Sequence, residues 1–99
     1  MFAERRHLNE IRLQIPRVLA RYADGRTELW LAGATVGELL THLRQERPEL
    51  YRCVCDETGR VRTHINLFVN NDFLHQRDGL NTELTADDVV SVFQAVSGG

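Results

Sequence analysis

Four short runs of this sequence alternate between apolar and polar residues, and the stretch between the second and third runs has helical spacing instead. Successive side chains of a strand point to opposite sides, so strict alternation predicts a strand with one buried face. The alternating runs cover residues 10–16, 27–33, 64–70 and 88–96. The sequence therefore predicts a sheet that buries one face under a single helix.

The stretch at residues 34–50 repeats its apolar side chains every three or four positions, as one face of a helix requires. Those side chains are Val36, Leu39, Leu40 and Leu43. Thr35 and Glu38 have the spacing of a capping box, in which each side chain accepts a hydrogen bond from a first-turn amide. Pro48 predicts the end of this helix, and residues 49–60 predict a short helical turn followed by a loop.

The order of the elements predicts the topology. Asp24 and Gly25 predict a turn, so the first two strands would form a hairpin with a long loop. Residues 73–84 predict a short edge strand and an irregular loop. The first and last strands are the most apolar, and we expect them at the centre. Together these features predict an α+β fold of the β-grasp, or ubiquitin-like, type, with a mixed sheet of four or five strands and one face open to water.

The alternation also sorts the side chains of the sheet into two faces. The side chains expected to face the helix are Ile11, Leu13, Leu29, Leu31, Ile65, Leu67, Val69, Val90 and Val92. Trp30, Phe68 and Phe93 then point outward, with Phe68 and Phe93 on neighbouring strands. Such a pair can simply stabilise the sheet, by up to about 1 kcal/mol. Clustered exposed aromatic side chains are also typical anchors of a partner-binding surface, and both interpretations stay open.

Length and composition bound the function. A chain of 99 residues predicts one domain, which we assign to residues 1–96, with residues 97–99 as a flexible tail. The formal net charge of −2 and the lack of a basic cluster give no reason to expect nucleic acid. No apolar stretch approaches the roughly 20 residues that span a bilayer, and the first ten residues lack a signal-peptide core. We expect a cytoplasmic protein that is monomeric when free.

Cys53 and Cys55 are the only cysteines, and their spacing is poor for a mutual disulfide. It favours two reduced, partly buried thiols. A metal or redox pair, helped by His42, His64 and His75, is the alternative, but no second ligand pair with zinc-like spacing accompanies the C-x-C motif. We therefore expect no metal site.

The last four residues, Val96, Ser97, Gly98 and Gly99, follow the last predicted strand directly. Terminal glycines alone are a weak signal. Without Cβ atoms, however, they can thread a narrow channel and present the terminal carboxylate to another protein. A carboxylate is a poor acyl donor until it is activated, normally as a mixed anhydride with a nucleotide phosphate. After a β-grasp pattern, such a tail indicates chemistry at its end.

Four segments carry a resemblance to a known family: "LAGATVGELL", "INLFVNND", "DGLNTEL" and "DDVVSVFQAVSGG". From Ile11 to Gly99 the chain resembles the ubiquitin-like sulfur carriers, which include the small subunit of molybdopterin synthase and the carriers of the thiamine and cysteine pathways. It is most similar to the cysteine-type carriers, through "VNN", "GLNT" and "AVSGG". One departure is Asp87, which stands where the family usually has a glycine.

The resemblance implies a protein co-substrate that is not itself an enzyme. An ATP-dependent activating enzyme would adenylate the carboxylate of Gly99, sulfur would displace AMP to leave a thiocarboxylate, and an acceptor enzyme would take the sulfur. The carrier would bind no cofactor of its own, and ATP would be used by its partner. Phe68 and Phe93 would dock the partners, while Val96 and Ser97 would guide the tail. The histidines then need no catalytic role.

Three functions stay open at this point. The first is sulfur transfer for cysteine or another sulfur-containing small molecule, with molybdopterin synthesis as the alternative pathway. The second is protein modification, in which the adenylate passes to a lysine and forms an isopeptide bond. The third is a β-grasp adaptor with incidental glycines. A longer product trimmed to Gly99 would present the same reactive group.

Overall fold

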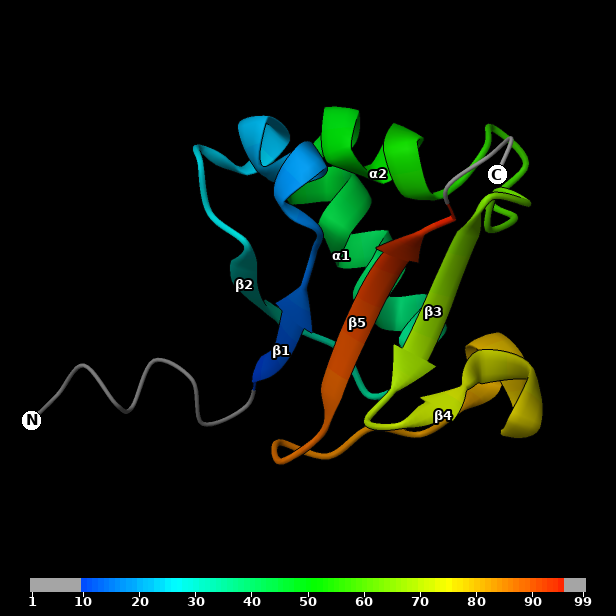
Figure 1. Ribbon diagram of the computed structural model, residues 1–99. Helices are drawn as coiled ribbons and strands as arrows, with labels where there is room; N and C mark the ends of the chain where they lie inside the picture. Colours follow the sequence, from blue (N-terminus) through cyan, green and yellow to red (C-terminus); the bar gives the residue numbers. More distant parts are fainter. Residues whose placement is uncertain (1–9, 96–99) are drawn as a thin grey trace, which may run out of the picture.

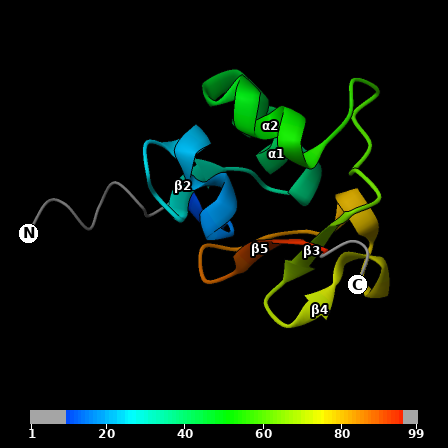
Figure 2. The same cartoon turned by 45° about the horizontal axis from the view of Figure 1, so that its top comes forward.

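The computed structural model describes residues 10–95, which form a five-stranded sheet with helices packed on one face (Figure 1). The strands are β1 (Glu10–Gln14), β2 (Glu28–Ala32), β3 (Ile65–Val69), β4 (Asp72–Phe73) and β5 (Val89–Gln94). The α-helices are α1 (Val36–Glu46) and α2 (Pro48–Val54). Three 3₁₀ helices are η2 (Arg17–Ala23), η3 (Leu74–Gln76) and η4 (Gly79–Asn81). Figure 2 shows α1 and α2 on one side of the sheet, with the other side left uncovered by the described elements.

The sheet has the predicted β-grasp topology. Its strand order is β2-β1-β5-β3-β4, so the first and last strands are interior and β4 is the short edge strand. β1 pairs in parallel with β5, and every other pairing is antiparallel. The expectation of a mixed sheet with the first and last strands inside is confirmed. The alternation predicted that the last strand would continue to Val96, but β5 ends at Gln94. Val96 itself lies outside the described residues.

The core lies between the sheet and the two α-helices. All nine side chains predicted to face the helix are buried, and each exposes at most 5% of its surface. The helices contribute Val36, Leu39, Leu40, Leu43, Leu50 and Val54. Full burial of one such side chain is worth about 1.5–3 kcal/mol, so this layer supplies most of the driving force for folding.

The ends of α1 follow from local chemistry, with one difference from the prediction. The Glu38 amide donates to Thr35 Oγ1 at 3.1 Å, as a capping box requires. The Glu38 carboxylate, however, accepts from the Ala34 amide at 3.0 Å rather than from Thr35. Pro48 does end the first helix, but it also begins α2, a seven-residue helix that is longer than the single turn expected.

The connection between β1 and β2 also differs from the long loop expected. It contains the seven-residue helix η2, which buries Leu19, Ala20 and Ala23 and contacts α2. Asp24 ends this helix in the left-handed conformation at φ 56°, and Gly25 follows at φ 83°. The turn signal was thus correct. The helix before it was missed because its burial depends on α2, which is distant in sequence.

The turn before β5 accommodates Asp87 without strain, since Asp24 and Asn70 are the non-glycine residues with positive φ within residues 10–95. The Asp88 carboxylate accepts hydrogen bonds from the Thr85 amide at 2.8 Å and from Asn70 Nδ2 at 2.9 Å. Asn70 Oδ1 in turn accepts from the Val89 amide at 3.0 Å. These bonds fasten the start of β5 to the end of β3, whatever side chain residue 87 carries.

Candidate docking face

The uncovered side of the sheet carries the side chains that alternate with the core, and three of them form an aromatic cluster: Phe68, Phe73 and Phe93. The Phe68 and Phe73 rings lie 4.3 Å apart between centroids, and Phe68 meets Phe93 edge-on at 5.1 Å. Phe93 nevertheless keeps 54% of its surface exposed, and Phe73 keeps 37%. The mutual contacts are worth about 0.5–1.5 kcal/mol per pair, and they leave both Phe73 and Phe93 substantially exposed to solvent.

Strand register explains the cluster. On β3, Phe68 is opposite Ser91 of β5 and Phe73 of β4, while Asn66 is opposite Phe93. Phe68 therefore lies between the other two rings on the same face. The outward positions of Phe68 and Phe93 on neighbouring strands are confirmed, although their role in docking stays a prediction.

Phe73 was missed as a member of this cluster. The sequence did carry a signal for it, because a two-residue turn at Asn70 and Asn71 places residue 69 opposite 72 and residue 68 opposite 73. The segment from residue 73 was interpreted only as an edge strand and a loop, without a register, so no face was assigned to Phe73.

The rest of the face is polar. Arg12 forms an ion pair with Glu28 at 3.3 Å, and its guanidinium lies 5.9 Å from the centroid of the outward-facing Trp30 ring. Ser91 Oγ donates to Gln14 Oε1 at 3.3 Å. A shallow depression of about 540 Å³ joins this region to the aromatic cluster and is lined by Arg12, Gln14, Phe68, Asn70, Asn71, Val89, Ser91 and Phe93. A partner would thus meet an apolar patch with a polar border, which is the usual anatomy of a protein interface.

The described chain ends beside this face. The Ala95 amide donates to the His64 carbonyl at 2.7 Å, so Ala95 still follows the pairing of β5 with β3. Val96, Ser97, Gly98 and Gly99 lie outside the described residues, and their predicted roles are untested. The described chain therefore ends two residues after Phe93, and four further residues in an extended conformation span at most about 14 Å.

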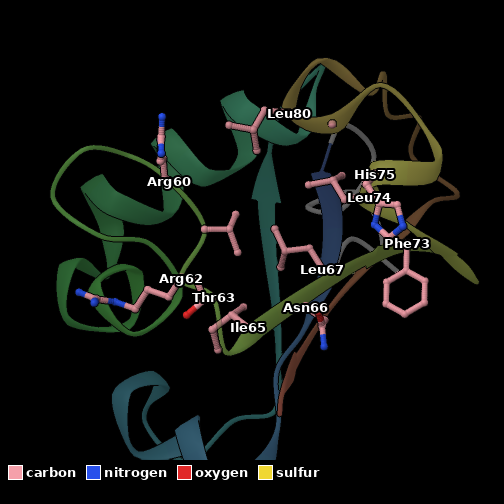
Figure 3. A pocket seen from close by; sticks show the side chains of 12 residues that line it. Arg60, Arg62, Thr63, Ile65, Asn66, Leu67, Phe73, Leu74, His75 and Leu80 are labelled. Carbon is pink, nitrogen blue, oxygen red and sulfur yellow. The ribbon is translucent and has the colours of Figure 1, made fainter.

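A second hollow lies at the edge of the sheet and was not predicted from the sequence. β4 pairs only with Phe68 and Val69, so within the described chain no strand covers the outer edge of β3 at Ile65–Leu67. A pocket of about 430 Å³ opens there (Figure 3). Leu67, Leu74 and Leu80 line it, while the side chains of Arg60 and Arg62 extend away from it. Phe73 belongs both to this rim and to the aromatic cluster.

The cysteines and histidines of residues 10–95 lie in separate places in the fold. Cys55 is buried, Cys53 is half-buried, and desolvation raises the pKa of both thiols. His42 Nδ1 donates to the Ala32 carbonyl at 2.6 Å, whereas His64 and His75 are exposed. Across residues 10–95, no group of three His, Cys, Asp or Glu side chains is placed to hold a metal ion. The metal interpretation therefore has no ligand set in this segment.

The architecture defines the class of protein. A mixed five-stranded sheet in the order β2-β1-β5-β3-β4, covered by helices on one face and carrying exposed aromatic rings on the other, is the ubiquitin-like β-grasp. Neither α-helix of residues 10–95 has the length and hydropathy needed to cross a bilayer.

The family follows from comparison with known proteins. A model described as the ThiS family matches residues 13–99, and the chain belongs to this family. Over 91 residues it is 24% identical to the sulfur carrier protein CysO of Mycobacterium tuberculosis, covering 90% of this chain and 98% of that one. It is 38% identical over 66 residues to the small archaeal modifier protein 3 of Haloferax volcanii, covering 67% of this chain and 71% of the other.

Solved structures confirm the fold. CysO in the BexX/CysO complex of Amycolatopsis orientalis superposes with a TM-score of 0.80 at 25% identity, covering 90% of this chain and 99% of that one. The small archaeal modifier protein 1 of Methanosarcina acetivorans gives a TM-score of 0.79 at 26% identity, with 91% and 96% covered. The resemblance drawn from the sequence is thus confirmed. The protein is a ubiquitin-like sulfur carrier of the ThiS/CysO type, and such proteins are small carriers rather than catalysts.

Proposed function

We propose that this chain carries sulfur as a thiocarboxylate on Gly99 and delivers it to the biosynthesis of cysteine or another sulfur-containing small molecule. The family match extends through Gly99, and this observation carries the proposal. The exposed aromatic cluster supports it, because β5 leads from Phe93 directly toward that end of the chain. A partner that binds the cluster would therefore receive the tail at a fixed point.

The reaction needs two steps at the terminal carboxyl group. An oxygen of the Gly99 carboxylate attacks the α-phosphorus of ATP, and pyrophosphate leaves. Sulfide then attacks the carbonyl carbon, the bond from that carbon to the phosphate oxygen breaks, and AMP leaves behind a thiocarboxylate. Where a persulfide supplies the sulfur, the first product is an acyl disulfide, and a second thiol of the partner must reduce its S–S bond, forming a disulfide, to release the thiocarboxylate. The activating enzyme supplies ATP and the catalytic groups, and the carrier itself binds no cofactor. We place this exchange in the cytoplasm.

The docking role falls to the aromatic cluster. Buried aromatic anchors dominate binding energy at protein interfaces, and Phe93 and Phe73 are the large apolar side chains of this face that are still exposed. The related CysO forms a complex with BexX, which supports a protein partner for this chain as well. Val96 and Ser97 would then guide the glycines into the partner's active site, in the mode by which partners capture a terminal carboxylate.

Protein modification is the second candidate. The relative that is 38% identical over 66 residues is named a modifier protein, and the same adenylate can acylate a lysine of a target. Molybdopterin synthesis is the alternative pathway for sulfur transfer. Both share the first step with the proposed function and differ only in what attacks the activated Gly99.

Mass spectrometry of the intact chain tests the proposal. The chain is incubated with the activating enzyme of a ThiS-family carrier, ATP, magnesium and sulfide, and a matched chain lacking Gly99 is treated in parallel. We expect a mass gain equal to replacing one oxygen by sulfur, located on Gly99 and absent from the shortened chain. If AMP is released but the C-terminus stays unmodified, the result contradicts sulfur transfer. A tail linked to a lysine of another protein would favour protein modification instead.

A further inference from the structure

Every basic side chain of this protein other than histidine is an arginine. The 99 residues include 12 arginines and no lysine. An arginine guanidinium stays protonated at any physiological pH and has no lone pair to offer, whereas a lysine amine is the usual nucleophile for an activated carboxyl group. The distinction matters for a protein whose own C-terminus would be activated.

Several arginines of residues 10–95 make ion pairs or stacking contacts. Arg47 pairs with Asp24 at 3.1 Å and Arg77 with Asp72 at 3.5 Å. Arg44 lies 5.8 Å from the centroid of the Tyr51 ring. Planar guanidinium groups suit ion pairing and stacking on aromatic rings better than a lysine ammonium, so arginine supplies the favourable charge contacts of the domain without adding an amine.

The two thiols are poorly placed to attack an activated carboxyl group. Cys55 exposes 1% of its surface and belongs to the core, and Cys53 is half-buried beside it. Only the thiolate is a good nucleophile, and desolvation raises the pKa of both cysteines. The hydroxyls of Thr82 and Ser91 are buried, and other hydroxyls are weak nucleophiles without an activating base.

We propose that this chain can give its activated C-terminus to sulfide or to another protein but has no side-chain amine on which to receive one. The inference rests on the proposed activation of Gly99. Its consequence for function is specific: no lysine isopeptide bond can link two copies of this chain, because no lysine on the first copy can accept a second. An activated carrier that has not yet reacted with sulfide is also not lost to aminolysis by lysines of other copies.

The reaction excluded here is a simple aminolysis. A lysine nitrogen would attack the activated Gly99 carbonyl and form a C–N bond. The bond to the leaving group, AMP or a thiol, would break, and the nitrogen would lose one proton to solvent. Within one chain this gives a ring lighter by one water than the free acid, and between two chains it gives a linked dimer.

Two arginine-to-lysine variants test the inference. Arg60 and Arg26 are both exposed, and neither side chain makes a hydrogen bond or ion pair within residues 10–95. Arg60 lies in the loop that leads to β3, four residues before the His64 that pairs with Ala95, so Arg60→Lys puts an amine within reach of the chain's own tail. Arg26 precedes β2 at the opposite edge of the sheet (Figure 1), so Arg26→Lys supplies an amine for a second copy.

Chemical activation separates this test from the proposed enzymology. Each protein is prepared as a full chain with its α-amine acetylated and Gly99 converted to a thioester by intein cleavage, and is held at mildly alkaline pH while intact mass is followed. We expect hydrolysis alone for the wild-type chain. We expect ring or dimer product to rise at least about tenfold in the variants, with rings favoured by Arg60→Lys and dimers by Arg26→Lys.

Each outcome decides the question. Rings or dimers from the wild-type chain at the rate of the variants would overturn the inference, and so would variants that only hydrolyse. Hydroxylamine added to each thioester shows that the carbonyl is reactive, because it should give the hydroxamate in all three proteins. Repeating the series with the activating enzyme and ATP tests the proposed function separately. Failure of adenylation there would contradict that function and leave the thioester result standing.

Discussion

The two faces of the sheet use the same strands for opposite purposes. Val92 and Phe93 are adjacent on β5, yet Val92 exposes 2% of its surface and Phe93 exposes 54%. On the helix-covered face, apolar side chains are removed from water and stabilise the fold. On the open face, apolar side chains stay in water, and they lie where β5 leads toward the C-terminus.

This difference shows that the hydrophobicity of a residue does not by itself tell whether that residue stabilises the fold or binds a partner. An apolar residue on the inner face contributes to folding, whereas an apolar residue on the outer face is available for binding. A substitution at one position should therefore change stability, while the same substitution one residue further should change recognition. The predictions at Val92 and Phe93 test this separation, and a prediction at Asp88 tests the bonds that hold the start of β5.

The largest effect is expected on the inner face. Val92→Glu places a carboxylate among Leu13, Leu67 and the other core side chains, where the sheet and helices offer it no water. Burial of an unpaired charge is among the most destabilising changes known. We expect a loss of at least about 4 kcal/mol of unfolding free energy, measured by urea denaturation followed by circular dichroism. A stable Val92→Glu protein would show that the strand phase is wrong.

A smaller effect on stability is expected at Asp88, whose hydrogen bonds hold the start of β5 to the end of β3. Partial desolvation of Asp88 raises its pKa, but hydrogen bonds from Thr85 and Asn70 outweigh that effect, and its pKa is lowered overall. Asp88→Ala removes these bonds, and we expect a loss of about 1–2 kcal/mol near neutral pH.

The pH dependence has a definite sign. A carboxyl whose pKa is lowered by folding stabilises the protein above its unfolded pKa, which is about 3.9 for aspartate. That contribution is lost as the pH falls through the folded pKa. The difference between wild type and Asp88→Ala in urea denaturation should therefore be largest near pH 6 and shrink below pH ~4. A difference that stays constant to strongly acidic pH would contradict this role for the carboxylate.

The smallest effect on stability is expected at Phe93, the matched partner of Val92. Phe93→Glu removes an edge contact with Phe68 and puts a charge in solvent, so we expect unfolding free energy to fall by no more than about 1 kcal/mol. Activation by a cognate enzyme should fall much further, measured as the rate of pyrophosphate release. Phe93→Leu, which keeps an apolar side chain, serves as the control and should retain more activity. An unfolded Phe93→Glu protein would place Phe93 in the core.

Periodicity alone determined much of this molecule. Alternation in the strand runs decided which side chains face the helices, because the strand period of two residues fixes their direction once one of them is buried. The spacing of Leu39 and Leu43, with Thr35 as the cap, determined α1. The topology followed from the order of these elements, and a tail ending in Gly98 and Gly99 indicated the family.

Tertiary structure decided what depends on contacts between distant segments. Helix η2 is buried because α2 packs against it, and Phe73 joins Phe68 only through the register of β3 with β4. The edge pocket exists because β4 stops after two residues. Local sequence sets the period and direction of side chains over a few residues, whereas these features depend on which strands and helices meet, and that choice is made by the energy of the whole core.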